Sequence, residues 1–234
     1  MKVSVIIPAG GSGVRFGNLI PKQLVLLDDK PIIVHTIQAF EIHPLISSVI
    51  LSVAENWIDR YQELILLHNL SKVTTITIGG NNRQTSIANA LFTSEALSSD
   101  IVLVHDSVRP FISQNLISTV VSTAIQSGAA IPVLNCKETI KLVNSNGIVI
   151  QTLDRNLLRS VQTPQGFKRD ILVSAYNEHQ INSMSTTDDA SLVEAIGIQV
   201  STISGEESNI KITTPLDFKL AELILSDLKI QQHE

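Results

Sequence analysis

The stretch that decides the fold is VSVIIPAGGSGVRFGNLIPKQ, residues 3–23. It opens with an apolar run, Val3–Ile7, typical of a strand that is buried on both faces. Glycines follow at once, with two cations just beyond them: Gly10, Gly11, Gly13, Arg15 and Lys22. Glycine lets the backbone turn and lets its N–H groups come close to a ligand. The stretch therefore predicts a buried strand that leads into an anion-binding loop, with phosphate as the expected anion.

Two familiar phosphate-binding loops are excluded by the order of these residues. A Walker A loop needs Gly-Lys followed by Ser or Thr, and no glycine of this chain precedes a lysine. The dinucleotide fingerprint needs Gly or Ala three residues after its second glycine, and after Gly11 and Gly13 that position is Phe16. At this point a turn without a ligand, with Arg15 and Lys22 as solvated cations, stays open as the alternative.

Composition narrows the class of protein. The chain has 234 residues, of which 44% are hydrophobic and only 4% aromatic, so branched aliphatic side chains can fill a sizeable core. A net charge of −5 argues against a nonspecific nucleic-acid partner or an anionic membrane surface. No apolar run is long enough to cross a bilayer, and the N-terminus leads straight into the first strand. We expect no nucleic acid, no membrane and a cytoplasmic location.

Cysteine and histidine usage points the same way. The single cysteine, Cys136, rules out an internal disulfide, fits a reducing compartment and is expected to be a small buried hydrophobe. The six histidines are scattered and no pair has the spacing of zinc ligands, so no zinc site is expected.

Strand-like apolar runs alternate with longer helical patterns along the chain. The strands are expected at Val3–Pro8, Ser48–Val53, Val73–Ile78, Ile101–His105, Ala129–Leu134 and Ile198–Ile203. The helices are expected at Ile32–Glu41, Asn56–Leu67, Gln84–Leu97, Asn115–Gln126, Arg169–His179 and Pro215–Ile230. This alternation predicts an α/β fold: a Rossmann-like, open, mostly parallel sheet with helices on both faces, in one domain spanning 1–234.

One segment, about 136–155, breaks the alternation. Polar and apolar residues alternate on both sides of Asn144-Ser145-Asn146-Gly147, and Asn-Gly flanked by such runs is a strong hairpin signal. An isolated two-stranded hairpin is marginally stable. We therefore expect a protruding β-hairpin arm that packs on a second subunit and makes a homodimer.

Ligands of open α/β sheets bind outside the carboxyl ends of the strands. Glycine, polar and cationic residues follow several of the expected strands: Arg15, Lys22, Gly79, Gly80, Arg83, Ser86, Asp106, Arg109 and Lys211. Each has an ordinary alternative: Asp106 could cap a turn, Arg83 could be a surface cation, and TTDDAS at 186–191 could be only a helix N-cap. Their joint appearance at strand ends favours a site for a phosphate-rich pair of ligands.

Seven motifs carry a resemblance over nearly the whole chain. They are PAGGSGVRFG, PKQ, GGNNRQTS, VHDSVRP, DRNLLRSVQTPQGF, TTDDAS and NIKITTP. In this order they resemble those of the 2-C-methyl-D-erythritol 4-phosphate cytidylyltransferases, which have a nucleotidyltransferase (GT-A-like) fold. The ribitol 5-phosphate cytidylyltransferases share most of these motifs and remain the alternative. TTDDAS and DRNLLRSVQTPQ are closer to the methylerythritol enzymes.

The resemblance implies an enzyme that transfers CMP from CTP to a polyol phosphate, with Mg²⁺ as cofactor. Arg15 and Lys22 would be the catalytic cations. Nucleotide binding would fall to Pro8, Ala9, Gly10, Gly11, Gly13, Gly80, Asn81, Ser86, Asp106 and Ser107. Polyol phosphate binding would fall to Asp106, Arg109, Thr139, Arg155, Thr163, Thr187 and Lys211, with Thr139 and Arg155 reaching into the partner's site. Asp106 is the one possible protein ligand of the metal, which the CTP phosphates would otherwise hold.

This chemistry needs no general base, because a phosphate monoester is largely dianionic at neutral pH. It needs positioning and cations around phosphorus instead. Two further alternatives are a sugar 1-phosphate nucleotidyltransferase, whose loop usually continues Arg-Leu-x-Pro where this chain has Arg15 and then Phe-Gly, and a non-catalytic nucleotide-binding module on the same fold.

Overall fold

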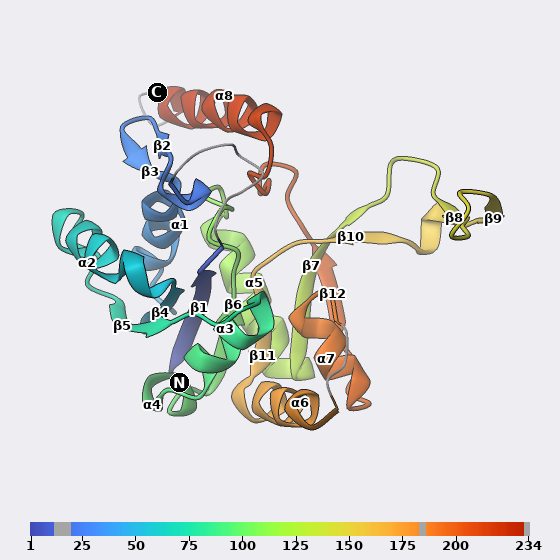
Figure 1. The fold of residues 1–234 in the computed structure, drawn as a ribbon, viewed down its shortest axis with the longest axis horizontal. Coiled ribbons are helices and arrows are strands. Elements are labelled where there is room, and N and C mark those ends of the chain that lie inside the picture. Colours follow the sequence, from blue (N-terminus) through green and yellow to red (C-terminus); the bar gives the residue numbers. More distant parts are fainter. Residues whose placement is uncertain (12–19, 183–185, 232–234) are drawn as a thin grey trace.

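The computed structural model describes residues 1–11, 20–182 and 186–231 (Figure 1). An eight-stranded sheet forms its centre. The strands are β1 (Val3–Ala9), β4 (Ser48–Val53), β5 (Val73–Ile78), β6 (Ile101–Val104), β7 (Ala129–Asn135), β10 (Arg159–Val161), β11 (Gln165–Lys168) and β12 (Ser201–Ser204). They run in the order β5-β4-β1-β6-β11-β7, and both β10 and β12 also pair with β7.

The sheet is mostly parallel, as the sequence predicted. The pairs among β1, β4, β5 and β6 are parallel, and so is β12 with β7. The exceptions are β10 and β11, which lie antiparallel to β7, with β11 also antiparallel to β6. These two strands were not predicted, and they place the QTPQGF segment in the middle of the sheet.

Helices cover both faces of the sheet. On one face, α1 (Ile32–Glu41), α2 (Ile58–Leu67) and α5 (Gln114–Ser127) pack in a core cluster with Val5 and Ile7 of β1. On the other face, α3 (Arg83–Leu91), α4 (Ser94–Leu97), α6 (Arg169–Asn182) and α7 (Asp189–Ala195) pack around Ile6. Alternate residues of β1 thus point into two different cores, which is why its sequence is apolar almost throughout.

Several predicted boundaries are confirmed and others are wrong. Strands at 48–53 and 73–78 and the helix at 32–41 have the predicted bounds. The single helix expected at 84–97 is two helices, because the Thr93 hydroxyl accepts a hydrogen bond from the Ala96 N–H and starts α4 anew. The last strand begins at Ser201 rather than Ile198, since its pairing with β7 starts with Ser201 opposite Ala130.

The last helix, α8 (Pro215–Gln231), covers the end of the domain beside the small β2–β3 pair (Leu26–Leu27 and Lys30–Pro31). Pro215 is its first residue, as predicted, and the Thr214 hydroxyl accepts a hydrogen bond from the Asp217 N–H at 3.2 Å. A third apolar cluster joins α8 to the segment after β6 through Val108, Phe111 and Ala221. This cluster fixes the segment that follows β6 in the chain and the residues that precede α8.

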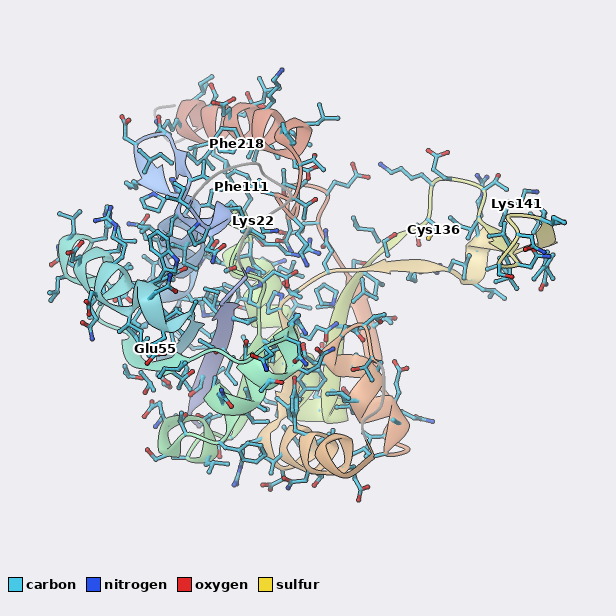
Figure 2. The ribbon with its side chains drawn as sticks, viewed as in Figure 1. Lys22, Glu55, Phe111, Cys136, Lys141 and Phe218 are labelled. Atoms are coloured by element: carbon cyan, nitrogen blue, oxygen red, sulfur yellow. The ribbon has the colours of Figure 1, made fainter. Side chains whose placement is uncertain are left out.

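The predicted hairpin exists and protrudes from the domain (Figure 1). Its strands are β8 (Lys141–Val143) and β9 (Val149–Thr152), and the Asn144 side chain accepts hydrogen bonds from the backbone N–H groups of Asn146 and Ile148, each at 3.0 Å. Gly147 takes a φ of +78°, which explains the Asn-Gly pair. Figure 2 shows Cys136 and Lys141 on this arm, well apart from Lys22. Cys136 is only half-buried, so its expected place in a core was wrong.

Within residues 1–11, 20–182 and 186–231, no helix combines the length and the apolar character needed to cross a bilayer.

Candidate active site

Two adjoining cavities lie at the carboxyl ends of β1, β5 and β6. The first cavity, of about 350 Å³, is lined by ten residues predicted for nucleotide binding, catalysis or substrate binding: Pro8, Gly10, Gly11, Lys22, Gly80, Asn81, Ser86, Asp106, Ser107 and Lys211. The second cavity, of about 280 Å³, is lined by five residues predicted for the polyol phosphate: Asp106, Arg109, Thr163, Thr187 and Lys211. Three residues line both cavities: Arg83, Asp106 and Lys211.

The first glycine loop is held from behind by Gln23, a residue that the sequence did not single out. Its side chain is buried, and its amide nitrogen donates to the carbonyl oxygens of Ala9 at 2.6 Å and Gly11 at 3.3 Å. Ala9 is therefore buried and turned toward Gln23 rather than lining the cavity. Gly13 and Arg15 lie outside the described residues.

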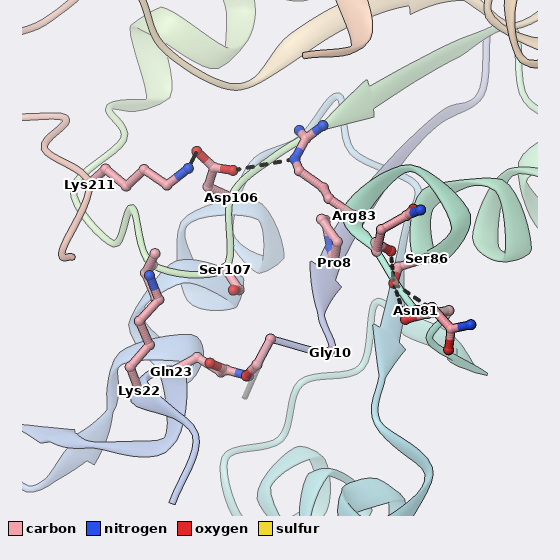
Figure 3. Close-up of a pocket in the computed structure, with 14 residues that line it drawn as sticks. Pro8, Gly10, Lys22, Gln23, Asn81, Arg83, Ser86, Asp106, Ser107 and Lys211 are labelled. Carbon is pink, nitrogen blue, oxygen red and sulfur yellow. Dashed lines mark hydrogen bonds and ion pairs between the residues drawn. The ribbon is translucent and has the colours of Figure 1, made fainter. Parts of the chain in front are cut away.

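The second glycine loop is folded tightly on the start of α3. A Cβ on Gly80 would lie 2.3 Å from Thr85 Cγ2, so only glycine fits without a shift. The Gly80 N–H donates to Ser86 Oγ at 3.0 Å, and the Ser86 hydroxyl donates to the Asn82 carbonyl at 2.8 Å. Asn82 is the N-cap of α3, accepting from the Thr85 N–H at 2.7 Å. These contacts bring Asn81 and Ser86 to the cavity wall that faces the first loop (Figure 3).

Asp106 is the electrostatic centre of the site. Its carboxylate lies 3.1 Å from Lys211 Nζ, 3.1 Å from Arg109 Nε and 3.9 Å from Arg83 Nε, and Figure 3 shows Lys211 and Arg83 approaching it from opposite sides. Burial alone would raise the pKa of Asp106, but the charges of Lys211, Arg109 and Arg83 outweigh it and hold that pKa well below its ordinary value. Asp106 is thus ionised, and three cations share one carboxylate at the junction of the cavities.

The backbone of Asp106 is fixed through Thr163 by the neighbouring residue His105, which the sequence also did not single out. Burial lowers the pKa of the His105 ring to about 4, so the ring is neutral at pH 7. The Arg109 carbonyl, 3.0 Å away, can only accept, so His105 Nε2 carries the proton and Nδ1 accepts from the Thr163 hydroxyl at 3.1 Å. Thr163 Oγ1 in turn accepts from the Asp106 N–H at 3.1 Å. The hydroxyl proton of Thr163 is therefore already engaged within the protein.

Two predicted substrate residues are not brought to the cavities of this chain. Thr139 and Arg155 are exposed on the arm, where an Arg155 guanidinium N–H donates to the Lys137 carbonyl at 3.1 Å. Neither lines the first or the second cavity.

The described residues contain no group of three or more His, Cys, Asp or Glu side chains that could hold a metal ion. One carboxylate, that of Asp106, does stand at the junction of the cavities. Mg²⁺ commonly binds through one or two carboxylates together with substrate phosphates and water. The site therefore fits a Mg²⁺ ion that arrives with a nucleotide better than one held in a protein cage.

Comparison with known proteins gives one consistent family. The family model described as "IspD: 2-C-methyl-D-erythritol 4-phosphate cytidylyltransferase" matches residues 3–227. A protein of that name from Alkaliphilus oremlandii is 42% identical over 227 residues, which cover 96% of this chain and 95% of the relative. The crystal structure of the Thermus thermophilus protein of that name is 32% identical with a TM-score of 0.76, covering 96% of this chain and 98% of the other. The Francisella tularensis structure is also 32% identical, with a TM-score of 0.81 and coverages of 96% and 100%.

Proposed function

The chain belongs to the 2-C-methyl-D-erythritol 4-phosphate cytidylyltransferase family, and from this premise we infer that it transfers the cytidylyl group of CTP to 2-C-methyl-D-erythritol 4-phosphate and releases pyrophosphate. The family match covers nearly the whole chain, so it includes both cavities as well as the arm. The observation that supports the reaction most directly is the pair of cavities that share Arg83, Asp106 and Lys211. Two phosphate-bearing substrates need such a cationic junction.

We propose that CTP occupies the first cavity and the polyol phosphate the second. The loops around Gly10 and Gly80 offer close backbone approach for the nucleotide. Arg109, Thr187 and Lys211 face the second cavity, where the cations suit a phosphate monoester. The α-phosphorus of CTP and the attacking phosphate oxygen would then meet beside Lys211.

The reaction proceeds by attack of a phosphate oxygen of the polyol phosphate on the α-phosphorus. A new phosphorus–oxygen bond forms, the bond from that phosphorus to the bridging β-phosphate oxygen breaks, and its electron pair leaves with pyrophosphate. The attacking phosphate is largely dianionic at neutral pH, so no side chain has to remove a proton. Lys22 and Lys211, with Arg15 by resemblance, would stabilise the charge that gathers around phosphorus.

We propose Mg²⁺ as the cofactor, held by the CTP phosphates with the Asp106 carboxylate as its one protein ligand. When bound, it would supply positive charge that offsets the charge of the phosphates. Asp106 meanwhile orients Lys211 and Arg109 through its two ion pairs.

We propose further that the chain works as a homodimer through the arm. Apolar side chains of the hairpin are largely exposed: Leu142 (46%), Val143 (49%), Ile148 (63%), Val149 (54%) and Ile150 (61%). An exposed apolar surface of this kind on a thin hairpin favours cover by another chain. Arg155 and Thr139, which do not line the two cavities of their own chain, would then serve those of the partner. A single domain over 1–234 and a cytoplasmic location stay predictions.

Subunit exchange tests the shared site. Arg155→Ala and Lys22→Met should each be nearly inactive alone. A mixed dimer would have one site with both defects and one with neither, so exchange should restore part of the activity. Mixed dimers without any recovery would show that both residues serve the same chain.

Pyrophosphate release tests the reaction itself. The protein should release pyrophosphate from CTP with 2-C-methyl-D-erythritol 4-phosphate in the presence of Mg²⁺. Ribitol 5-phosphate, several other polyol phosphates and the other three nucleoside triphosphates form the comparison panel. Faster turnover of ribitol 5-phosphate would reassign the substrate, and no release with any pair would point to a binding module.

A further inference from the structure

We propose that Arg83 is a substrate-binding residue that serves both cavities, and that Asp189 is the positioning residue that aims it. The proposal rests on the proposed function and adds two residues to it. Arg83 and Asp189 come from the GGNNRQTS and TTDDAS segments, which are about a hundred residues apart in the chain and meet at the wall between the cavities.

Arg83 stands at the junction by its place in the fold. It is the first residue of α3 and lines both the first and the second cavity. Its Nη2 lies 2.7 Å from Asp189 Oδ2, and its Nε lies 3.9 Å from Asp106 Oδ1. The guanidinium therefore lies between a fully buried carboxylate and the carboxylate that faces the substrates.

Asp189 is held more firmly than an ordinary surface partner. Its side chain is fully buried at the start of α7, and the Tyr176 hydroxyl donates to its Oδ1 at 2.6 Å. Its backbone N–H donates to Gln165 Oε1 at 3.1 Å. With one oxygen fixed by Tyr176 and the backbone fixed by Gln165, the other oxygen has a set direction, and that direction is toward Arg83.

The protein does not use all the donors of this guanidinium. Nη2 faces Asp189, Nε is farther from Asp106 than a hydrogen bond allows, and Nη1 is buried and has no hydrogen-bond partner among the described residues. A guanidinium carries five N–H donors that match phosphate geometry. An arginine that only tied α3 to α7 would have its donors satisfied by protein. This one keeps unsatisfied donors on a side chain that lines both cavities.

A second contact joins the same two segments. The Gln84 side-chain amide donates to the Thr186 carbonyl at 2.8 Å. The loop that lines the first cavity is thereby tied to the segment that supplies Thr187 and Asp188 to the second. Loss of the Arg83–Asp189 pair should therefore weaken both substrates, unlike loss of Arg109, which lines the second cavity and not the first.

Four variants and two measurements test this. CTP affinity is measured by calorimetry with Mg²⁺ and no second substrate, and KM is measured for 2-C-methyl-D-erythritol 4-phosphate. Arg83→Met should weaken CTP at least about tenfold and raise that KM at least about tenfold, the effect of losing one charged contact. Asp189→Asn should cause smaller losses of both. Tyr176→Phe, which frees one oxygen of Asp189, should weaken both substrates less than Asp189→Asn does. Arg60→Met is the matched control, since Arg60 pairs with the exposed Glu63 on the surface.

The double variant separates binding from simple structure. Arg83→Met leaves the buried Asp189 charge without its cation, so the melting temperature should fall, and adding Asp189→Asn should recover it. If Arg83 binds substrate, the two affinities should stay low in the double variant. Recovery of the affinities together with the melting temperature, or near-normal affinities in Arg83→Met itself, would overturn the proposal.

Two outcomes distinguish a failure of the Arg83 proposal from a failure of the proposed reaction. Wild-type protein that neither binds CTP nor releases pyrophosphate would refute the proposed function. Wild-type protein that does both, with Arg83→Met equally active, would refute only the role of Arg83. If Arg83→Met does not fold, Arg83→Lys takes its place, because it keeps the charge and loses the fork that reaches Asp189 and the cavities together.

Discussion

Asp106→Asn is the sharpest test of the charge arrangement between the two cavities. The substitution keeps the shape of the side chain and removes its charge. Lys211, Arg109 and Arg83 then remain within 3.1, 3.1 and 3.9 Å of a neutral group. At an effective dielectric of about 20, each of the two closer contacts is worth roughly 5 kcal/mol of gross Coulomb energy.

The net loss of stability is smaller than this sum. Burial of the carboxylate opposes the attraction, and Lys211 is 42% exposed, so that solvent screens its share. Removing one member of a buried charge pair typically costs about 3–5 kcal/mol. For a protein of this size each kcal/mol corresponds to roughly 2–4 °C, so we expect the melting temperature at pH 7 to fall by roughly 6–20 °C.

An anion should reverse part of this loss. Three cations without their carboxylate form a stronger phosphate site, so inorganic phosphate should raise the melting temperature of Asp106→Asn more than that of the wild type. Asp170→Asn is the matched control, since its pair with Arg169 is on the surface with Asp170 82% exposed. A fall of less than about 2 °C, or equal phosphate gains in both proteins, would refute the charge arrangement.

The same carboxylate predicts a pH effect with a definite sign. The pKa of Asp106 is lowered in the folded protein from its ordinary 3.8. Its stabilising contribution is therefore complete above 3.8 and is lost as the pH falls from there. Wild-type unfolding should be more sensitive to acid in this range than that of Asp106→Asn.

Three more predictions follow from the site. Lys22→Met should lower kcat by about 10²–10³ while changing CTP affinity far less, and near-normal kcat would remove it from catalysis. EDTA should abolish pyrophosphate release and Mg²⁺ should restore it, whereas full turnover without a divalent cation would contradict the metal role. Burial lowers the pKa of His105 to about 4, so its stabilising effect is complete above 6.5 and is lost between there and about 4. His105→Gln should remove up to about 3 kcal/mol of that pH dependence. If its free energy of unfolding falls between pH 6.5 and about 4 as much as that of the wild type, this role of His105 is refuted.

The elements of the fold could be predicted wherever their side-chain pattern is typical of a single kind of secondary structure. The run Ser48–Val53 is buried at every position, so its apolar character marks a central strand without ambiguity. β10 and β11 carry no such pattern: RSV is exposed throughout, and QGFK owes its place to partners on both sides rather than to its own composition. Strands held by tertiary pairing alone leave little trace in a local sequence.

The site divides in the same way. The glycines, Asp106 and Lys211 could be predicted from their residue types and their positions after strands, and the structure brings them together in one cavity. Gln23 and Asp189 instead support residues that line the cavities. Gln23 binds the Ala9 carbonyl beside the first glycine loop, and Asp189 pairs with Arg83, which is distant in the chain. Glutamine and an aspartate in the first turn of a helix are common, so only the folded geometry distinguishes these two.

The shared wall of the cavities bears on how a catalytic cycle ends. Arg83, Asp106 and Lys211 border both cavities, so a molecule that fills both contacts the lining residues of the two cavities at the same time. The cytidine diphosphate product is such a molecule, since it joins the two halves that entered separately. Its dissociation requires the contacts in both cavities to break together, whereas pyrophosphate dissociates from one cavity alone. We therefore expect product inhibition to be strong, and a compound that links a cytidine to a polyol through a short anionic bridge to outcompete either substrate.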